Sequence, residues 1–262
     1  MDNKLSSRAE IVGIPNSTAK TRDRIIIRSN APVLEGSLPV PDAPTPRLVY
    51  DAFLITAYHD FYKPAVAPRV IGLGLGAALL AELVFSGHLA VRSHEGRDLV
   101  LSEPRGGPPR DSLGLWLTEL VQGEPEHLAV PDWLEYLAIA DTQTKTAEHM
   151  VVAGLMVRGE QRSRWLGKVQ VTYDAADALI AQAPLARLRR YLSTMDRRMP
   201  LLDAFLLALT EAVGLSKSLY SQMPSGAREY AEGHLRVLPA PLQAIRGHLT
   251  AAVADTAITG NL

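Results

Sequence analysis

The chain has 262 residues, of which 47% are apolar and 21% charged, and its formal net charge is −1. This is the composition of a globular protein, and the small net charge excludes a global basic field for holding nucleic acid. Cysteine is absent, which excludes disulfides, thiol catalysis and cysteine-ligated metal. The N-terminus lacks the apolar core of a signal peptide, and no run approaches the roughly 18 apolar residues of a membrane span. We therefore expect a cytoplasmic protein that can meet a membrane only at its surface.

Residues 1–46 differ in composition from the rest of the chain. A short β-prone run, "III" at 25–27, stands between arginines, and prolines crowd the stretch 32–46. Proline at this density blocks both helices and central strands. We predict an extended N-terminal arm over 1–46, which proteases should cut first, and a folded domain over 47–262.

From residue 47 onward, apolar residues recur with the helical period. Leu48, Ile55 and Tyr58 fall on one stripe of a first helix, and Gly87 is placed to end the second as its C-cap. The stretch 131–154 is long enough to form either one helix or two. The predicted helices fall within residues 47–60, 77–87, 111–123, 131–154, 174–192, 200–215 and 229–257.

Strand signals are confined to two short hairpins, near 89–101 and 155–171, each with a polar turn. The stretches "LVFSGHLAV" and "MVVAGLMVR" align at an offset of 67 residues, with Gly87 matching Gly154. Each is a helix that ends at a glycine and runs into a hairpin. The sequence therefore predicts a mainly α fold, a single helical domain with one or two short β-hairpins. The two helix–hairpin units could be winged-helix-like.

Motifs of enzymatic sites are missing. Gly72, Gly74 and Ala77 fit the G-x-G-x-x-G/A pattern of dinucleotide-binding loops, but Pro68 interrupts the preceding segment and a hairpin follows. We interpret these glycines as flexible residues ahead of a tightly packed helix. No histidine pair has metal-site spacing, and neither a G-x-S-x-G nor a phosphate-loop motif occurs. We predict a protein that is not an enzyme and needs no cofactor or metal.

Two arginines precede the apolar helix that starts near Pro200. Arg197 and Arg198 stand at the positive end of its dipole, where a cation needs an anionic partner. Another basic group, Arg162 and Arg164 with Trp165, occupies the tip of the second hairpin. A tryptophan beside cations suits a protein contact or a membrane interface, so we predict a hairpin contact there. The sequence also allows a homo-oligomer, formed through this hairpin or through the N-terminal arm.

In chain order, four segments resemble the Golgi phosphoprotein 3 family: "GAALLAELVFSGHLAV" (76–91), "PDWLEYLA" (131–138), "AEHMVVAGLM" (147–156) and "MDRRMPLLDAFLLAL" (195–209). They resemble the family's Leu-Glu-Leu helix with its Gly-x-Leu turn, its Trp-Ile-Glu-Leu-Leu helix, the stretch before its hairpin, and its Met-Asp-Arg-Arg helix start. The matching residues are Glu82, Leu83, Gly87, Leu89, Trp133, Leu134, Glu135, Leu137, Gly154, Met195, Asp196, Arg197 and Arg198.

The resemblance implies a mostly helical domain with a protruding hairpin. Eukaryotic members are peripheral membrane proteins that bind phosphatidylinositol 4-phosphate and act as trafficking adaptors, and this chain resembles the family's bacterial relatives. The family's headgroup site uses a tryptophan and three arginines. Counted from Gly87 and Gly154, those positions here hold Ala67, Gly76, Ala140 and Gln143.

Three nearby cations, Lys63, Arg69 and Lys145, are the candidate lipid-binding residues in place of that site. Lysine is a point charge and does not replace a bidentate arginine fork. We therefore predict weak, salt-sensitive binding to anionic lipid, with little preference for phosphatidylinositol 4-phosphate.

The family keeps Asp-Arg-Arg away from its headgroup site, so we expect Arg197 and Arg198 to be structural. Their expected partners are internal carboxylates such as Glu82, Glu135 or Asp203. The function predicted is that of a binding or adaptor protein, with a protein partner that the sequence does not identify. The alternative is a winged-helix-like nucleic-acid-binding or regulatory protein, against which the net charge of −1 argues.

Overall fold

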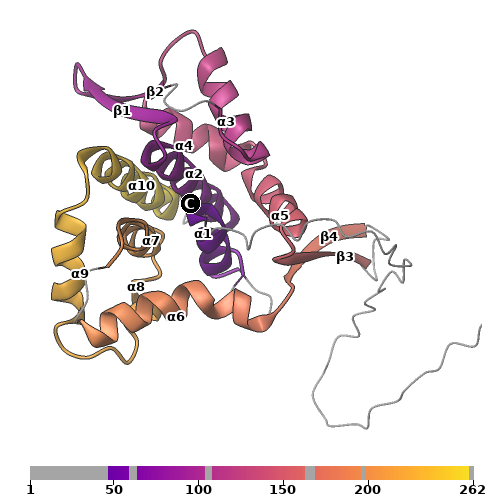
Figure 1. The fold of residues 1–262 in the computed structure, drawn as a ribbon, viewed down its shortest axis with the longest axis vertical. Coiled ribbons are helices and arrows are strands. Elements are labelled where there is room, and N and C mark those ends of the chain that lie inside the picture. Colours follow the sequence, from indigo (N-terminus) through magenta and orange to yellow (C-terminus); the bar gives the residue numbers. More distant parts are fainter. Residues whose placement is uncertain (1–46, 59–63, 104–107, 163–168, 196–198, 260–262) are drawn as a thin grey trace, which may run out of the picture. The chain divides into compact units, whose positions relative to one another are not determined.

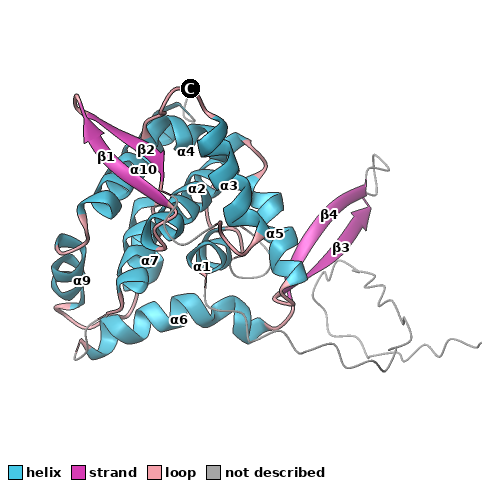
Figure 2. Cartoon of the chain, turned by 45° about the horizontal axis from the view of Figure 1, so that its top comes forward, coloured by secondary structure: helices cyan, strands magenta, loops and turns pink. Residues whose placement is uncertain are grey.

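The computed structural model describes residues 47–58, 64–103, 108–162, 169–195 and 199–259. All of them belong to one compact unit within residues 36–262. This described part contains ten helices and two two-stranded antiparallel hairpins, which confirms the predicted mainly α fold (Figures 1 and 2). The predicted arm, residues 1–46, lies outside the described residues and stays a prediction. The elements are α1 (Leu48–Thr56), α2 (Pro68–Phe85), β1 (Leu89–His94), β2 (Arg97–Ser102), α3 (Ser112–Gly123), α4 (Val130–Ile139), α5 (Thr142–Val152), β3 (Met156–Arg162), β4 (Val169–Ala175), α6 (Ala178–Thr194), α7 (Leu201–Ala212), α8 (Ser216–Tyr220), α9 (Ala227–Arg236) and α10 (Ala240–Thr259).

The helix α2 forms the centre of the core. Every residue from Val70 to Ala81 is buried, and α1, α4, α5, α7 and α10 all pack against this helix (Figure 1). By length and composition α2 could cross a membrane, with 18 residues and a mean hydropathy of 1.6. This corrects the expectation that no run approaches that length. Because 72% of the helix is buried inside the protein, it has the surroundings of a core helix.

The start of α2 also differs from the prediction. The helix was expected from about Ala77 but begins at Pro68, where proline is favoured because its missing N–H would be unpaired anyway. The glycines of the dinucleotide-like pattern therefore lie inside the helix. A Cβ on Gly72 would come within 2.7 Å of the carbonyl oxygen of Ala138 on α4. Glycine at this position allows the close approach of two helix backbones.

The stretch 131–154 forms two helices that meet at a sharp corner. α4 ends at Ile139 and α5 begins at Thr142, and between them Asp141 has a φ of +59°. The Thr142 hydroxyl donates to the carbonyl oxygen of Leu137 at 2.6 Å, which satisfies one of the unpaired groups at the end of α4. We refer to residues 138–145 as the α4–α5 corner.

The two helix–hairpin units have the same local geometry. Gly87 and Gly154 both adopt left-handed backbone angles, with φ of +77° and +72°. In both units the glycine N–H donates to the carbonyl oxygen three residues earlier, at 3.1 Å for Gly87 and 3.0 Å for Gly154. The N–H of the residue after the glycine donates to the carbonyl oxygen five residues before that residue, at 2.9 Å in both units. This is the Schellman arrangement, and it turns the chain into β1–β2 and β3–β4. Both predicted hairpins are confirmed.

Candidate functional site

The packing of α2 on α4 brings together the two segments where the headgroup positions were expected. Gly72 lies against the backbone of Ala138. Arg69 comes three residues before this contact in the chain, and Ala140 comes two residues after it. The first turn of α2 and the α4–α5 corner are therefore neighbours, although some 70 residues separate them in sequence.

Arg69 is exposed, but its charge is already compensated. Its guanidinium forms an ion pair with Glu135 on α4, and its Nε donates to the Thr256 hydroxyl on α10 at 3.3 Å. A cation in the first turn of a helix is unfavourable by itself, and the carboxylate offsets this effect. Arg69 therefore links α2 to α4 and α10, and any anionic ligand would compete with Glu135 for it.

Lys145, also exposed, is the last residue of the corner and lies in the first turn of α5. Its ammonium nitrogen is 5.2 Å from the ring centroid of Trp116 on α3, which is within the range of a cation–π contact. The sequence does not indicate this contact, because the position of Trp116 within an apolar helix gives no sign of which charge lies beside it. The pair places a cation and an indole next to each other at the surface.

The residues at the four positions expected from the resemblance do not supply the tryptophan and three arginines of a headgroup site. Ala67 is the exposed residue before α2, while Ala140 and Gln143 are half-buried at the α4–α5 corner. Gly76 is buried, and a Cβ on it would meet the Leu137 Cβ at 2.9 Å. Without a shift of α4, position 76 has no room for any side chain.

Lys63, Arg164 and Trp165 lie outside the described residues. Arg162 is the last residue of β3, where its backbone pairs with Val169, and its side chain is not described. The hairpin contact stays a prediction.

A half-buried arginine network holds α1, α2 and α3 together. Arg47, at the start of α1, contacts the Glu82 carboxylate through Nε and the Asp111 carboxylate through Nη1, both at 2.7 Å. Glu82 also accepts from the backbone N–H of Val49 at 3.2 Å, and Asp111 accepts from that of Gly114 at 2.7 Å as the N-cap of α3. These two carboxylates cap helix starts while they neutralise one guanidinium.

Next to this network, Tyr50 and His149 form a hydrogen bond between α1 and α5. The bond joins the Tyr50 hydroxyl to Nδ1 of His149. Burial, followed by the charge of Arg47, lowers the pKa of His149 below its ordinary value, although Asp111 and Glu82 act in the opposite direction. Burial likewise raises the pKa of Tyr50. Both effects favour the neutral forms of the phenol and the imidazole.

A second arginine fork joins α1, α6 and α7. Arg187 contacts Asp51 at 2.5 Å and Asp203 at 2.8 Å. Burial raises the pKa of Asp51, and this effect exceeds the lowering by Arg187. The site therefore consists of carboxylates from two helices that converge on one planar guanidinium.

The carboxylates proposed as partners of Arg197 and Arg198 each bind a different arginine. Those two arginines lie outside the described residues, so their role stays a prediction. The observed pairs are Arg47 with Glu82, Arg69 with Glu135, and Arg187 with Asp203.

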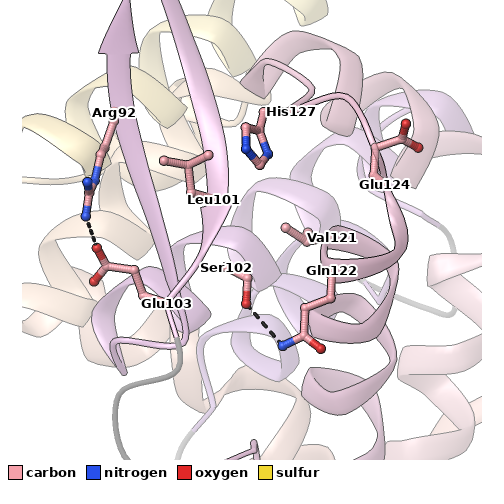
Figure 3. Close-up of a pocket in the computed structure, with 8 residues that line it drawn as sticks. All are labelled: Arg92, Leu101, Ser102, Glu103, Val121, Gln122, Glu124 and His127. Carbon is pink, nitrogen blue, oxygen red and sulfur yellow. Dashed lines mark hydrogen bonds and ion pairs between the residues drawn. The ribbon is translucent and has the colours of Figure 1, made fainter.

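A separate cleft of about 400 Å³ lies between the β1–β2 hairpin and α3 (Figure 3). Its polar groups are largely paired with each other: Arg92 with Glu103, and Gln122 with the Ser102 hydroxyl at 3.1 Å. His127 completes the lining, but among the described residues no three His, Asp or Glu side chains are placed to hold a metal ion.

Comparisons with known proteins identify the family. A search of curated proteins finds no match. Residues 48–257, which are most of the chain and contain every described helix apart from the last two residues of α10, match the family model of Golgi phosphoprotein 3 (GPP34), a non-catalytic adaptor family. This protein therefore belongs to the Golgi phosphoprotein 3 family.

Proposed function

We propose that this protein is a non-enzymatic adaptor that binds weakly to anionic membrane surfaces from the cytoplasmic side. Membership of a family of membrane-binding adaptors supports the proposal. The observation that carries it is the contact between the exposed Lys145, at the α4–α5 corner, and the half-buried Trp116. A cation attracts anionic lipid, and an indole favours the interfacial region of a bilayer.

The same geometry argues against selectivity for one phosphorylated headgroup. Such selectivity needs several charged donors that converge on the phosphate, preferably arginine forks. Where α2 packs on α4, Gly76 stands at one expected arginine position, and its contact with Leu137 leaves no room for a side chain. Arg69 is paired with Glu135. What remains is general attraction, which contributes about 1 kcal/mol for each cation near an anionic surface. Lys145, Arg69 and Lys63 are the residues that we propose supply it.

Vesicle sedimentation tests this function directly. The full chain is mixed with neutral vesicles, phosphatidylserine vesicles and phosphatidylinositol 4-phosphate vesicles, the last two matched in charge. We expect binding to both anionic vesicles alike, and its loss as salt rises from about 50 to about 500 mM and shortens the Debye length. Lys145→Gln should weaken binding, while Arg236→Gln, an exposed arginine on α9, serves as the matched control.

Two results would overturn the proposal. Tight, salt-resistant binding that is selective for phosphatidylinositol 4-phosphate would show a dedicated headgroup site. Salt-dependent shifts of DNA without any vesicle binding would instead favour the winged-helix-like alternative.

A further inference from the structure

An open cleft lies between the second half of α6 and the short helix α8. Its described lining is Arg189, Gly214, Leu215, Lys217, Ser218 and Ser221, and its volume is about 410 Å³. The described lining thus contains two cationic side chains and two hydroxyl groups, and no carboxylate. All four polar side chains can donate hydrogen bonds, which suits a ligand with several acceptor oxygens and a negative charge.

Arg189 differs from the other half-buried arginines described above in that no carboxylate among the described residues contacts it. Arg47 and Arg187 each contact two carboxylates. Arg189 donates only to the Ser218 carbonyl oxygen, at 2.6 Å, and its buried Nε has no partner in the described part of the chain. A half-buried guanidinium without a counter-charge is unfavourable, and a bound anion would relieve that cost. The bond to Ser218 also holds the guanidinium against α8.

The second cation comes from α8 itself. Lys217 is exposed, and no carboxylate among the described residues pairs with it. It precedes Ser218 in the chain, so the lysine and the carbonyl that holds Arg189 belong to consecutive residues. The hydroxyls of Ser218 and Ser221 add neutral donors from the same segment.

We propose that this α6–α8 cleft binds an oxyanion of the phosphate-ester class, with Arg189 and Lys217 as its charged ligands. The phosphate belongs either to a soluble molecule or to a lipid headgroup, since both present the same terminal oxygens. The cleft uses none of the residues of the α4–α5 corner, so this inference does not depend on the proposed membrane function.

Calorimetric titration of the full chain with inorganic pyrophosphate tests the site, with sodium chloride of equal ionic strength as the reference. We expect saturable binding that weakens about tenfold in Lys217→Gln, as for the loss of one charge-assisted hydrogen bond. Arg189→Gln should weaken it at least as much. Arg190→Gln is the matched control, because this neighbouring arginine is exposed and its guanidinium lies over the Tyr191 ring. Absence of saturable binding by the unmodified chain, or equal affinity in Lys217→Gln, would overturn the proposal even if Arg189→Gln failed to fold.

A second arm identifies the source of the phosphate. Vesicles of phosphatidic acid, a phosphate monoester, are compared with phosphatidylglycerol vesicles, which carry a diester, at equal surface charge. Selective loss of phosphatidic acid binding in Lys217→Gln would support a lipid headgroup. Unchanged vesicle binding, together with weakened pyrophosphate binding, would support a soluble phosphate ester.

Discussion

Gly72 on α2 lies directly against the backbone of Ala138 on α4, so that a Cβ added at position 72 would stand 2.8 Å from the Ala138 Cα. The added Cβ would clash with this Cα and with the Ala138 carbonyl oxygen. Both atoms belong to a helix backbone, which cannot move aside as a flexible side chain can. The contact sets the spacing between α2 and α4, and with it the position of the α4–α5 corner.

This relationship predicts that Gly72→Ala destabilises the protein. Alanine has the higher helix propensity, by about 1 kcal/mol, but overpacking against a fixed backbone costs about 1–3 kcal/mol and should dominate. We expect the free energy of unfolding, measured by urea denaturation, to fall by about 1 kcal/mol as the net of these two effects. Gly247→Ala is the control, because nothing lies within 4 Å of a Cβ at that position of α10. It should raise stability by roughly 0.5–1 kcal/mol, and a gain of similar size at Gly72 would contradict the packing argument.

Much of the helical framework could be predicted from apolar periodicity, but the start of α2 could not. Glycine has low intrinsic helix propensity, so a stretch with three glycines indicates a loop when it is considered alone. Here the helix extends through them because close packing against α4 outweighs that propensity. The short helix α8, Ser216–Tyr220, was also missed, since five residues are too few to show a period.

The arginine network shows where prediction from sequence stops. A need for arginine–carboxylate pairs was recognisable, and Glu82, Glu135 and Asp203 were named as the acids. Their observed partners were not, because Arg47 lies 35 residues from Glu82 and Arg69 lies 66 residues from Glu135. Local spacing carries no information on contacts of that separation, which depend on how the helices pack.

Removal of Arg47 should strongly destabilise the chain. The Arg47 and Glu82 side chains are only 13% and 19% exposed, so Arg47→Ala leaves Glu82 and Asp111 desolvated without their counter-charge. Loss of one partner from such a network costs about 3 kcal/mol, which should appear in the free energy of unfolding. Arg92→Ala provides the comparison, since that arginine is 63% exposed and its ion pair with Glu103 should contribute at most about 1 kcal/mol. Equal losses in the two variants would show that burial does not govern the effect.

The Tyr50–His149 contact predicts that stability decreases as the pH falls below about 6.5, the ordinary pKa of histidine. Because the pKa of His149 is lowered in the folded protein, the unfolded chain binds its proton more readily once the pH falls below about 6.5. Stability is therefore highest above that value and decreases as the pH falls toward the folded pKa. The groups that influence this imidazole are Arg47, which disfavours its protonation, and Asp111 and Glu82, which favour it.

His149→Gln tests this prediction, since glutamine keeps an acceptor for the Tyr50 hydroxyl but does not titrate. Melting temperatures measured at intervals of decreasing pH should decrease less steeply in the variant than in the unmodified chain. Parallel curves would assign the pH dependence to other groups.

The last prediction concerns the family's headgroup positions. Ala67, Ala140 and Gln143 are exposed or half-buried, so Ala67→Trp with Ala140→Arg and Gln143→Arg should fold and supply an aromatic and two guanidinium forks. We expect this triple variant to gain affinity for phosphatidylinositol 4-phosphate over phosphatidylserine vesicles of equal charge, measured by sedimentation. Gly76→Arg should not add to the gain, because its side chain would meet Leu137 in the core, where an unpaired charge costs several kcal/mol. A Gly76→Arg variant that retains its melting temperature and binds the phosphoinositide selectively would show that α4 yields at this position.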